Sequence, residues 1–225
     1  MDRITLVVNS CKTYSKIALP VFLEHANKYN PGFSIVLIIG GCPTPNPPSV
    51  IGHYTIVETR NNSLDYTGLI GLIEEDIKIK PLFFYIHDTT VLGPKFFSAL
   101  EAYSVLPEGK TSVSFQFPSC NIGIYSTSLL KKYEAEILAL RNTDESTDRL
   151  NYLKDVSILD EDKFFRLNIE NNAFFPTKSI PDWGTTSEFY KNGNQRLKEY
   201  FPDLDFTKLK ASWARKLDCK YTMSP

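Results

Sequence analysis

The sequence has few of the residues that build metal clusters, disulfide frameworks or membrane spans. Its 225 residues include four cysteines and three histidines. The cysteines are scattered without a Cys-x-x-Cys pair, which argues against a zinc site. No apolar stretch approaches the length that spans a bilayer, and the run after Met1 is too short and too β-branched for a secretory signal. We therefore expect a cytoplasmic protein with reduced thiols and no transmembrane segment.

An excess of charge of one sign is also missing. The chain carries 25 basic and 26 acidic residues, for a formal net charge of −1. A general nucleic-acid binder needs a basic excess to displace counterions, so no nucleic-acid partner is expected. Glycine is absent between Asn9 and Ser15, directly after the first expected strand. That absence argues against a dinucleotide-binding oxidoreductase.

The most informative feature that is present is the stretch 83–90, Phe-Phe-Tyr-Ile-His-Asp-Thr-Thr. An apolar run this short, with β-formers on both alternations, predicts a strand buried on both faces and hence central in a parallel sheet. The run stops abruptly on His87 and Asp88. Ligands of open α/β sheets bind beyond the carboxyl ends of the strands, so an acid there indicates an enzyme that holds a cation against a phosphate or takes a proton.

The first half of the chain alternates between strand and helix patterns. We expect strands at 4–9, 34–39, 54–58 and 82–86 and helices at 14–29, 64–77 and 94–103. This order predicts an α/β fold whose mostly parallel central sheet is flanked by helices on both faces. After residue 110 the pattern becomes irregular. We expect a strand at 112–117, a turn at 121–126, a helix at 127–140, a polar loop at 142–148, a strand near 164–169 and a loop at 174–183.

This layout resembles the GT-A group of nucleotide-sugar glycosyltransferases. The resemblance rests on four places: the end of the first strand at Asn9-Ser10, the helix that carries Asn61, Asn62, Asp65 and Gly68, the stretch His87-Asp88-Thr89, and the turn Phe117–Gly123. The chain also looks like the short, stand-alone catalytic domains of some bacterial and large-virus glycan enzymes. The resemblance implies one Rossmann-like GT-A domain over 1–225. Residues 1–105 would form its nucleotide-sugar-binding half, and 106–225 its acceptor-side half with a C-terminal helix.

The resemblance also implies a donor site. Its expected residues are Asn9, Ser10, Arg60, Asn62, Asp65, His87 and Asp88. The family has an Asp-x-Asp metal motif where this chain has Asp88, Thr89 and Thr90, so the second acid is replaced by a hydroxyl. Asp88 and Thr90 would then hold Mn²⁺ or Mg²⁺, because such ions use few protein ligands and complete their shell with water and substrate oxygens.

The acceptor side is expected around Asn121, Gly123 and Trp183, whose indole would stack on a sugar face. Removing a proton from an acceptor hydroxyl requires a carboxylate close to it. Asp182 is the first candidate for this base, and Asp155 and Glu188 are the next.

Each of these residues also has an ordinary structural interpretation. Asp88 would cap backbone amides at a strand end, His87 would be a core histidine, and Asp65 a solvated first-turn acid. Arg60 and the candidate bases would be surface charges, and Asn121 and Gly123 part of a tight turn. Apolar residues at 206, 209, 213 and 217 share a helical face with lysines around it. That face would pack on the domain or contact an anionic membrane.

Two functions are consistent with these residues. The first is transfer of a hexosyl or deoxyhexosyl group from a nucleoside diphosphate sugar to a hydroxyl of a glycan, assisted by a divalent metal. The second is a degenerate GT-A-like domain that binds a nucleotide or glycan without turnover, and the loss of the second motif acid favours it.

Overall fold

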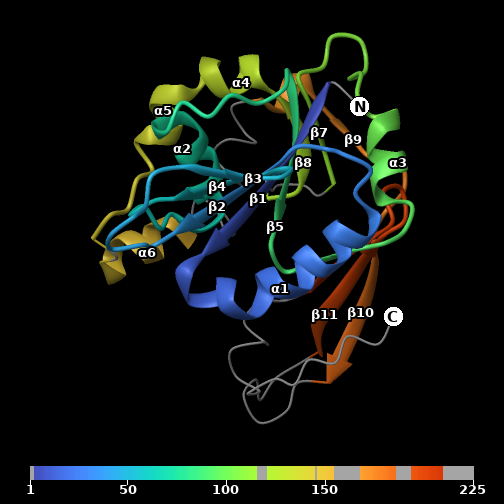
Figure 1. Cartoon of the computed structure of the whole chain (residues 1–225). Coiled ribbons are helices and arrows are strands. Elements are labelled where there is room, and N and C mark those ends of the chain that lie inside the picture. The colour runs from blue at the N-terminus through green and yellow to red at the C-terminus, as the bar shows by residue number, and fades with distance from the viewer. Residues whose placement is uncertain (1–2, 116–120, 145, 155–167, 186–193, 210–225) are drawn as a thin grey trace.

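The computed structural model describes residues 3–115, 121–144, 146–154, 168–185 and 194–209, and for 154, 181–185 and 194–197 it describes the backbone alone. A central sheet of eight strands has the order β3-β4-β2-β1-β5-β8-β7-β9 (Figure 1). Its middle consists of four mutually parallel strands, β4 (Tyr54–Glu58), β2 (Ile35–Gly40), β1 (Ile4–Cys11) and β5 (Leu82–His87). The predicted α/β class with a mostly parallel central sheet is confirmed.

The edges of this sheet contain the antiparallel pairs. Strand β3 (Ser49–Ile51) pairs antiparallel with β4, and β8 (Gly123–Ser126) pairs antiparallel with both β5 and β7 (Ser112–Ser114). Strand β9 (Asn172–Phe174) then adds parallel to β7. The turn expected at 121–126 is therefore wrong for residues 123–126, because they pair with β5 and extend the sheet.

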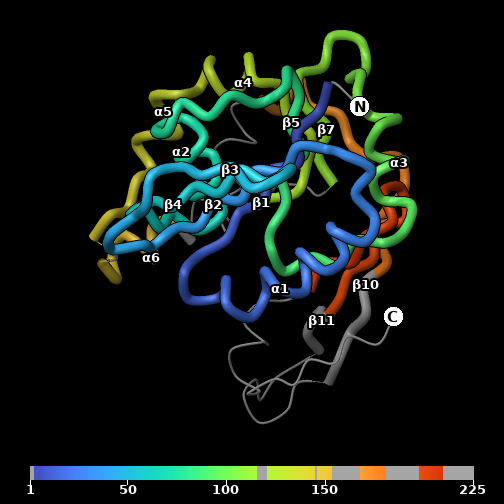
Figure 2. Tube along the Cα trace, viewed as in Figure 1, coloured from blue at the N-terminus to red at the C-terminus, as the bar shows by residue number. Residues whose placement is uncertain are grey.

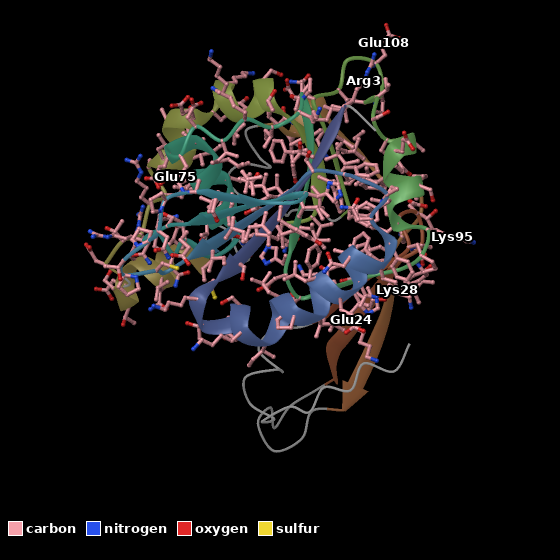
Figure 3. All side chains as sticks on the ribbon, in the orientation of Figure 1. Arg3, Glu24, Lys28, Glu75, Lys95 and Glu108 are labelled. Carbon is pink, nitrogen blue, oxygen red and sulfur yellow. The ribbon has the colours of Figure 1, made fainter. Side chains whose placement is uncertain are left out.

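Helices cover both faces of the sheet (Figures 1 and 2). One core cluster joins one face to α1 (Lys12–Tyr29) and α3 (Phe96–Ala102). The other cluster joins the opposite face to α2 (Thr67–Glu74), α4 (Thr127–Lys132), α5 (Glu134–Leu138) and α6 (Thr147–Lys154). Charged side chains such as Glu24, Lys28 and Glu75 are exposed at the periphery (Figure 3).

The central strands are apolar on both alternations because each face has its own core. In β5, Phe84 and Ile86 pack toward α1 and α3, whereas Phe83 and Tyr85 pack toward α2. Successive side chains of a strand point to opposite faces, so a run buried in both clusters has no polar alternation. The strand ends where the polar residues His87 and Asp88 begin, as the sequence predicted.

A second, antiparallel sheet has the order β10-β11-β12-β6. Its strands are β10 (Ile180–Thr185), β11 (Asn194–Phe201), β12 (Phe206–Leu209) and β6 (Thr90–Leu92). Strands β10 and β11 project away from the main sheet (Figure 1). The two sheets meet at residues 88 and 89: the Asp88 amide donates to the Asn9 carbonyl of β1 at 3.1 Å, and the Thr89 carbonyl accepts from the Leu209 amide at 2.8 Å.

Three further sequence expectations are wrong or incomplete. The C-terminal helix expected from residue 206 is wrong at its start, because 206–209 form strand β12. Phe206 pairs with Leu92 and is buried in the core near α3. The expected loop at 174–183 contains the end of β9 and the start of β10. The helix expected at 127–140 is interrupted at Tyr133. The expected strand near 164–169 lies largely outside the described residues, and 169 itself belongs to a short 3₁₀ turn (Ile169–Asn171). No helix in the described part of the chain has the length and apolar character needed to cross a bilayer.

Candidate functional site

A pocket opens where β1 and β5 end at the carboxyl edge of the central sheet. It encloses about 150 Å³, several times the roughly 30 Å³ that one water occupies in the liquid. Its lining residues are Asn9, Ser10, Cys11, Tyr14, Asn62, Leu64, Asp65, His87, Asp88 and Thr89.

The pocket brings together six of the seven residues expected at a donor site. The exception is Arg60, which is exposed and does not line it. Four lining residues were not expected: Cys11, Tyr14, Leu64 and Thr89. Cys11 and Tyr14 mark the passage from β1 into α1, and strand–helix junctions at this edge of an α/β sheet are the general place for ligands. That rule could have identified Cys11 and Tyr14 from the sequence.

Asp88 is buried, with 6% of its surface exposed, and directly follows the carboxyl end of β5. The Ser10 hydroxyl donates a hydrogen bond to its Oδ2 over 2.6 Å. Burial raises the pKa of Asp88 to about 6, against the opposing effect of hydrogen bonds from Ser10 and nearby backbone. Burial destabilises the charged form of this carboxylate, and a cation close to it would stabilise that form. The hydroxyl proton of Ser10 is therefore engaged by the Asp88 carboxylate.

His87 lies beside Asp88 and faces Asp65. Its Nε2 atom is 3.3 Å from Oδ1 of Asp65 but makes no hydrogen bond there. Burial lowers the pKa of His87 to about 4; Asp65 opposes this shift and Lys208 adds to it. The imidazole is therefore neutral at pH 7 and offers a polar edge without charge.

The first turn of α1 adds a feature that favours an anion. This 18-residue helix has no side-chain cap on its N-terminus and no acidic residue in its first turn. The first amides of a helix have no partner within it, and they carry the positive end of the helix dipole. Cys11 and Tyr14 place this end at the pocket. Phosphate groups bind in such positions.

The loop between β4 and α2 forms one wall and is fixed by buried amides. The Ser63 hydroxyl oxygen lies 2.6 Å from Oδ1 of Asn61 and 2.7 Å from the Leu140 carbonyl oxygen, and its one proton is donated to one of the two. The amide of Asn142 donates to the same Asn61 oxygen at 2.7 Å. Asn62 is held by its backbone, which exchanges hydrogen bonds with Asn142. Its side chain thus reaches the pocket from a rigid support.

The candidate metal ligands are only partly brought together. Asp88 lines the pocket with Asp65, whereas Thr90 does not line it. The buried Thr90 hydroxyl has no hydrogen-bond partner within the described part of the chain. The neighbouring Thr89 lines the pocket instead. Across the described residues, no group of three or more histidine, cysteine, aspartate and glutamate side chains is placed to hold a metal. Asp88 and its pocket still fit Mg²⁺ or Mn²⁺ bound mainly by water and substrate oxygens.

Of the expected acceptor residues, Asn121 and Gly123 are fully described and do not line this pocket. Gly123 is buried in β8, where a Cβ atom would come within 2.9 Å of the Val113 carbonyl, so close packing with β7 explains this glycine. Asn121 is half-buried before the same strand. Asp155 and Glu188 lie outside the described residues, as do the side chains of Asp182 and Trp183. The roles of all six expected acceptor and base residues stay predictions.

No protein-family model matches the sequence, and no curated protein matches it. Solved structures do resemble the fold. The glycosyltransferase GlyE of Streptococcus pneumoniae has a TM-score of 0.45 and 7% identity over 78% of this chain and 45% of its own. The galactosyltransferase LgtC, in complex with donor and acceptor sugar analogs, has a TM-score of 0.46 and 11% identity over 76% of this chain and 72% of its own.

A third similar structure is the mannosyltransferase PcManGT of Pyrobaculum calidifontis in complex with GDP-Man and Mn²⁺. Its TM-score is 0.41 and its identity 10%, over 58% of this chain and 46% of its own. This chain therefore spans less than half the length of GlyE and of PcManGT. The predicted resemblance to GT-A glycosyltransferases is confirmed as a resemblance of fold.

Proposed function

We propose that the protein transfers a hexosyl or deoxyhexosyl group from a nucleoside diphosphate sugar to a hydroxyl of a glycan acceptor. The observation that carries this proposal is Asp88, a buried carboxylate at the mouth of the central strand, in a pocket that also receives the amino end of α1. A carboxylate there attracts a cation, and a helix amino end attracts an anion. A metal-bound diphosphate satisfies both.

The charges of the pocket support a divalent cation. Among the described residues, the pocket is lined by the carboxylates of Asp65 and Asp88 but by no lysine or arginine. A bare diphosphate would be repelled by these two acids. Mn²⁺ or Mg²⁺ held at Asp88 would supply the positive charge that stabilises a leaving diphosphate.

The other pocket residues have defined tasks under this proposal. Ser10 holds the Asp88 carboxylate in one orientation. The first turn of α1 binds phosphate oxygens through its backbone amides. Asn62, Asp65 and the neutral His87 form the opposite wall and would bind the nucleoside through hydrogen bonds.

The second sheet supports a place for the base that takes the acceptor proton. Asp182 pairs with Lys198, Lys198 pairs with Leu209, and the Leu209 amide donates to Thr89 at the pocket. Asp182 therefore lies on one transverse row with Thr89, three strand spacings away. At roughly 4.8 Å per spacing this is about 14 Å. We propose Asp182, on the outer strand of this sheet, as the base that takes the acceptor proton.

The competing proposal is a domain that binds a nucleotide or glycan without transferring a sugar. The observation that favours it is the single carboxylate at the metal motif, because Thr90 does not line the pocket. A binder would retain nucleotide sugar intact, whereas a transferase hydrolyses it slowly to free nucleotide in the absence of an acceptor.

The deciding experiment is a screen of UDP and GDP sugars for nucleotide release with Mn²⁺ present. We expect release by the native protein and its loss in Asp88→Asn. The matched control is Asp76→Asn, which removes an exposed carboxylate paired with Lys78 away from the pocket. Calorimetric binding of a nucleotide sugar without any release would favour the binding domain. Full release by a folded Asp88→Asn protein would refute the assignment of Asp88.

A further inference from the structure

The pocket wall contains a strained residue. Leu64 has a φ angle of +54°, in the left-handed region that leucine adopts at a cost. The other described non-glycine residues with positive φ are Asp76 and Asp205, and aspartate tolerates this region because its short side chain bonds locally. Strain of this kind persists only where the surroundings hold it, and it concentrates at ligand sites.

Two side chains of the central sheet hold the strained turn. The side-chain amide of Asn9 donates to the Leu64 carbonyl at 3.0 Å, and the hydroxyl of Tyr85 donates to the next carbonyl, that of Asp65, at 2.8 Å. Asn9 comes from β1 and Tyr85 from the adjacent parallel strand β5. Two consecutive carbonyls are thus tied to two neighbouring strands.

The packing around Tyr85 keeps its hydroxyl in place. The ring is fully buried, and a Cβ atom at Gly68 would come within 2.6 Å of its hydroxyl oxygen. Glycine at position 68 therefore makes room for the Tyr85 ring under the start of α2. The hydroxyl reaches the turn only because this helix position has no side chain.

We propose that Asn9 and Tyr85 are positioning residues that hold the Leu64–Asp65 turn in the conformation that receives the nucleoside. This inference rests on the proposed function. Asn9, which the sequence predicts at the donor site, then acts on the ligand through Leu64. Asp65 and its neighbour His87 are presented to the ligand already in place, so binding does not have to order them.

The test is Tyr85→Phe, which removes the hydroxyl and retains the ring against Gly68. Tyr54→Phe is the matched control, because it removes a hydroxyl that binds Asn27 at the opposite part of the sheet. Calorimetry with UDP and GDP in the presence of Mn²⁺ gives the affinity of each protein. We expect Tyr85→Phe to bind nucleotide about five- to tenfold more weakly, the factor for one hydrogen bond, and Tyr54→Phe to bind unchanged.

A second variant separates positioning from a general loss of stability. Leu64→Asn places a residue that tolerates positive φ in the turn, so the turn should need less support. We expect the loss caused by Tyr85→Phe to shrink at least twofold in the Leu64→Asn background, as a coupling between the two sites. Amide hydrogen exchange at residues 63–67 should accelerate in Tyr85→Phe and not in Tyr54→Phe.

The outcomes distinguish this inference from the proposed function. Equal nucleotide affinity in Tyr85→Phe and the native protein would overturn the positioning role and leave the proposed function intact. Additive effects of Tyr85→Phe and Leu64→Asn would likewise overturn it. Failure of the native protein to bind either nucleotide with Mn²⁺ would instead refute the proposed function, and the ligand role of the turn with it.

Discussion

Two groups of buried polar side chains in this protein are organised in opposite ways. The first, which we call the β7–β9 network, consists of Thr111, Ser112, Ser114, Asn168 and Asn172. Asn172 Oδ1 accepts from Ser112 at 2.6 Å and from Ser114 at 3.0 Å, and its amide donates to the Ala173 carbonyl at 2.7 Å. Asn168 donates to Ser112 at 2.7 Å and accepts from Thr111 at 2.9 Å. Every side chain of this network bonds to another part of the protein.

The pocket differs because two of its buried polar atoms have no hydrogen-bond partner among the described residues. These atoms are Oδ1 of Asn9 and Nε2 of His87. An unsatisfied buried polar atom costs free energy, so a folded protein tolerates it where a ligand or a mechanism uses it. The β7–β9 network thus stabilises the sheet, whereas under the proposed function the two unpaired pocket atoms lie where the ligand would bind.

The largest test of this difference between the pocket and the β7–β9 network is Asp88→Asn. We expect nucleotide release to fall about 10²–10³-fold, the usual cost of losing one group that stabilises transition-state charge. The apo protein should become more stable at pH 8, by up to about 3 kcal/mol, because a charge with a pKa of about 6 is no longer buried. Activity assays and chemical denaturation measure the two effects. A less stable Asp88→Asn protein would contradict the cost assigned to this carboxylate.

The opposite pattern is expected for Asn172→Ala in the β7–β9 network. The change leaves two buried hydroxyls and one carbonyl without this partner, so the free energy of unfolding should fall by about 3 kcal/mol. The affinity for nucleotide with Mn²⁺ should stay within twofold of the native value. Denaturation and calorimetry on the same preparation test the pair of outcomes. A large loss of affinity in folded protein would show that the two groups are coupled.

Within the pocket, Asp88 and His87 should have opposite effects on how stability depends on pH. The raised pKa of Asp88 means that stability falls as pH rises from 3.8 to about 6. The lowered pKa of His87 means that stability rises with pH from about 4 to 6.5. The two effects oppose each other, so the native protein should show little net dependence on these residues between pH 4 and 6. In Asp88→Asn only the histidine effect remains, and stability should rise by about 3 kcal/mol over this window.

The smallest expected effect belongs to Ser10→Ala. Loss of the hydroxyl removes one hydrogen bond that favours the charged form of Asp88. The pKa of Asp88 should rise further, and the pH midpoint of Mn²⁺-nucleotide binding should move upward with it. Binding at pH 8 should weaken only a few-fold. Ser10→Thr retains a hydroxyl and should keep the native midpoint, which a merely steric role of Ser10 would not predict.

The central sheet was predictable because its signal is local. Strand β4 spans the predicted residues 54–58, and β1, β2 and β5 differ from prediction by one or two residues at an end. Both faces of these strands are buried, so their sequences are continuous apolar runs. Strand β12 was not predictable in this way. The spacing of Phe206 and Leu209 also fits a helix, and only the pairing with β6 determines that it is a strand.

The part of the pocket that could be predicted from the sequence consists of the polar residues at the ends of its strands. Asn9, Ser10, His87 and Asp88 come directly at the ends of β1 and β5, so the topology rule locates them. The hydrogen bond from Tyr85 to the Asp65 carbonyl could not be predicted from the sequence, because Tyr85 alternates with Phe83 as an ordinary core residue. Its function depends on the missing side chain at Gly68, a contact between residues 17 positions apart.

The junction of the two sheets constrains how the chain can change length. The Asp88 amide bonds into one sheet, and the carbonyl of the next residue bonds into the other. Inserting or deleting a residue between Asp88 and β6 would exchange the inward and outward faces of that strand, and would remove Leu92 from the core. The proline-rich segment 43–48, which is exposed throughout, has no such register to preserve. Descendants of this sequence should therefore accumulate insertions there and none beside the acid.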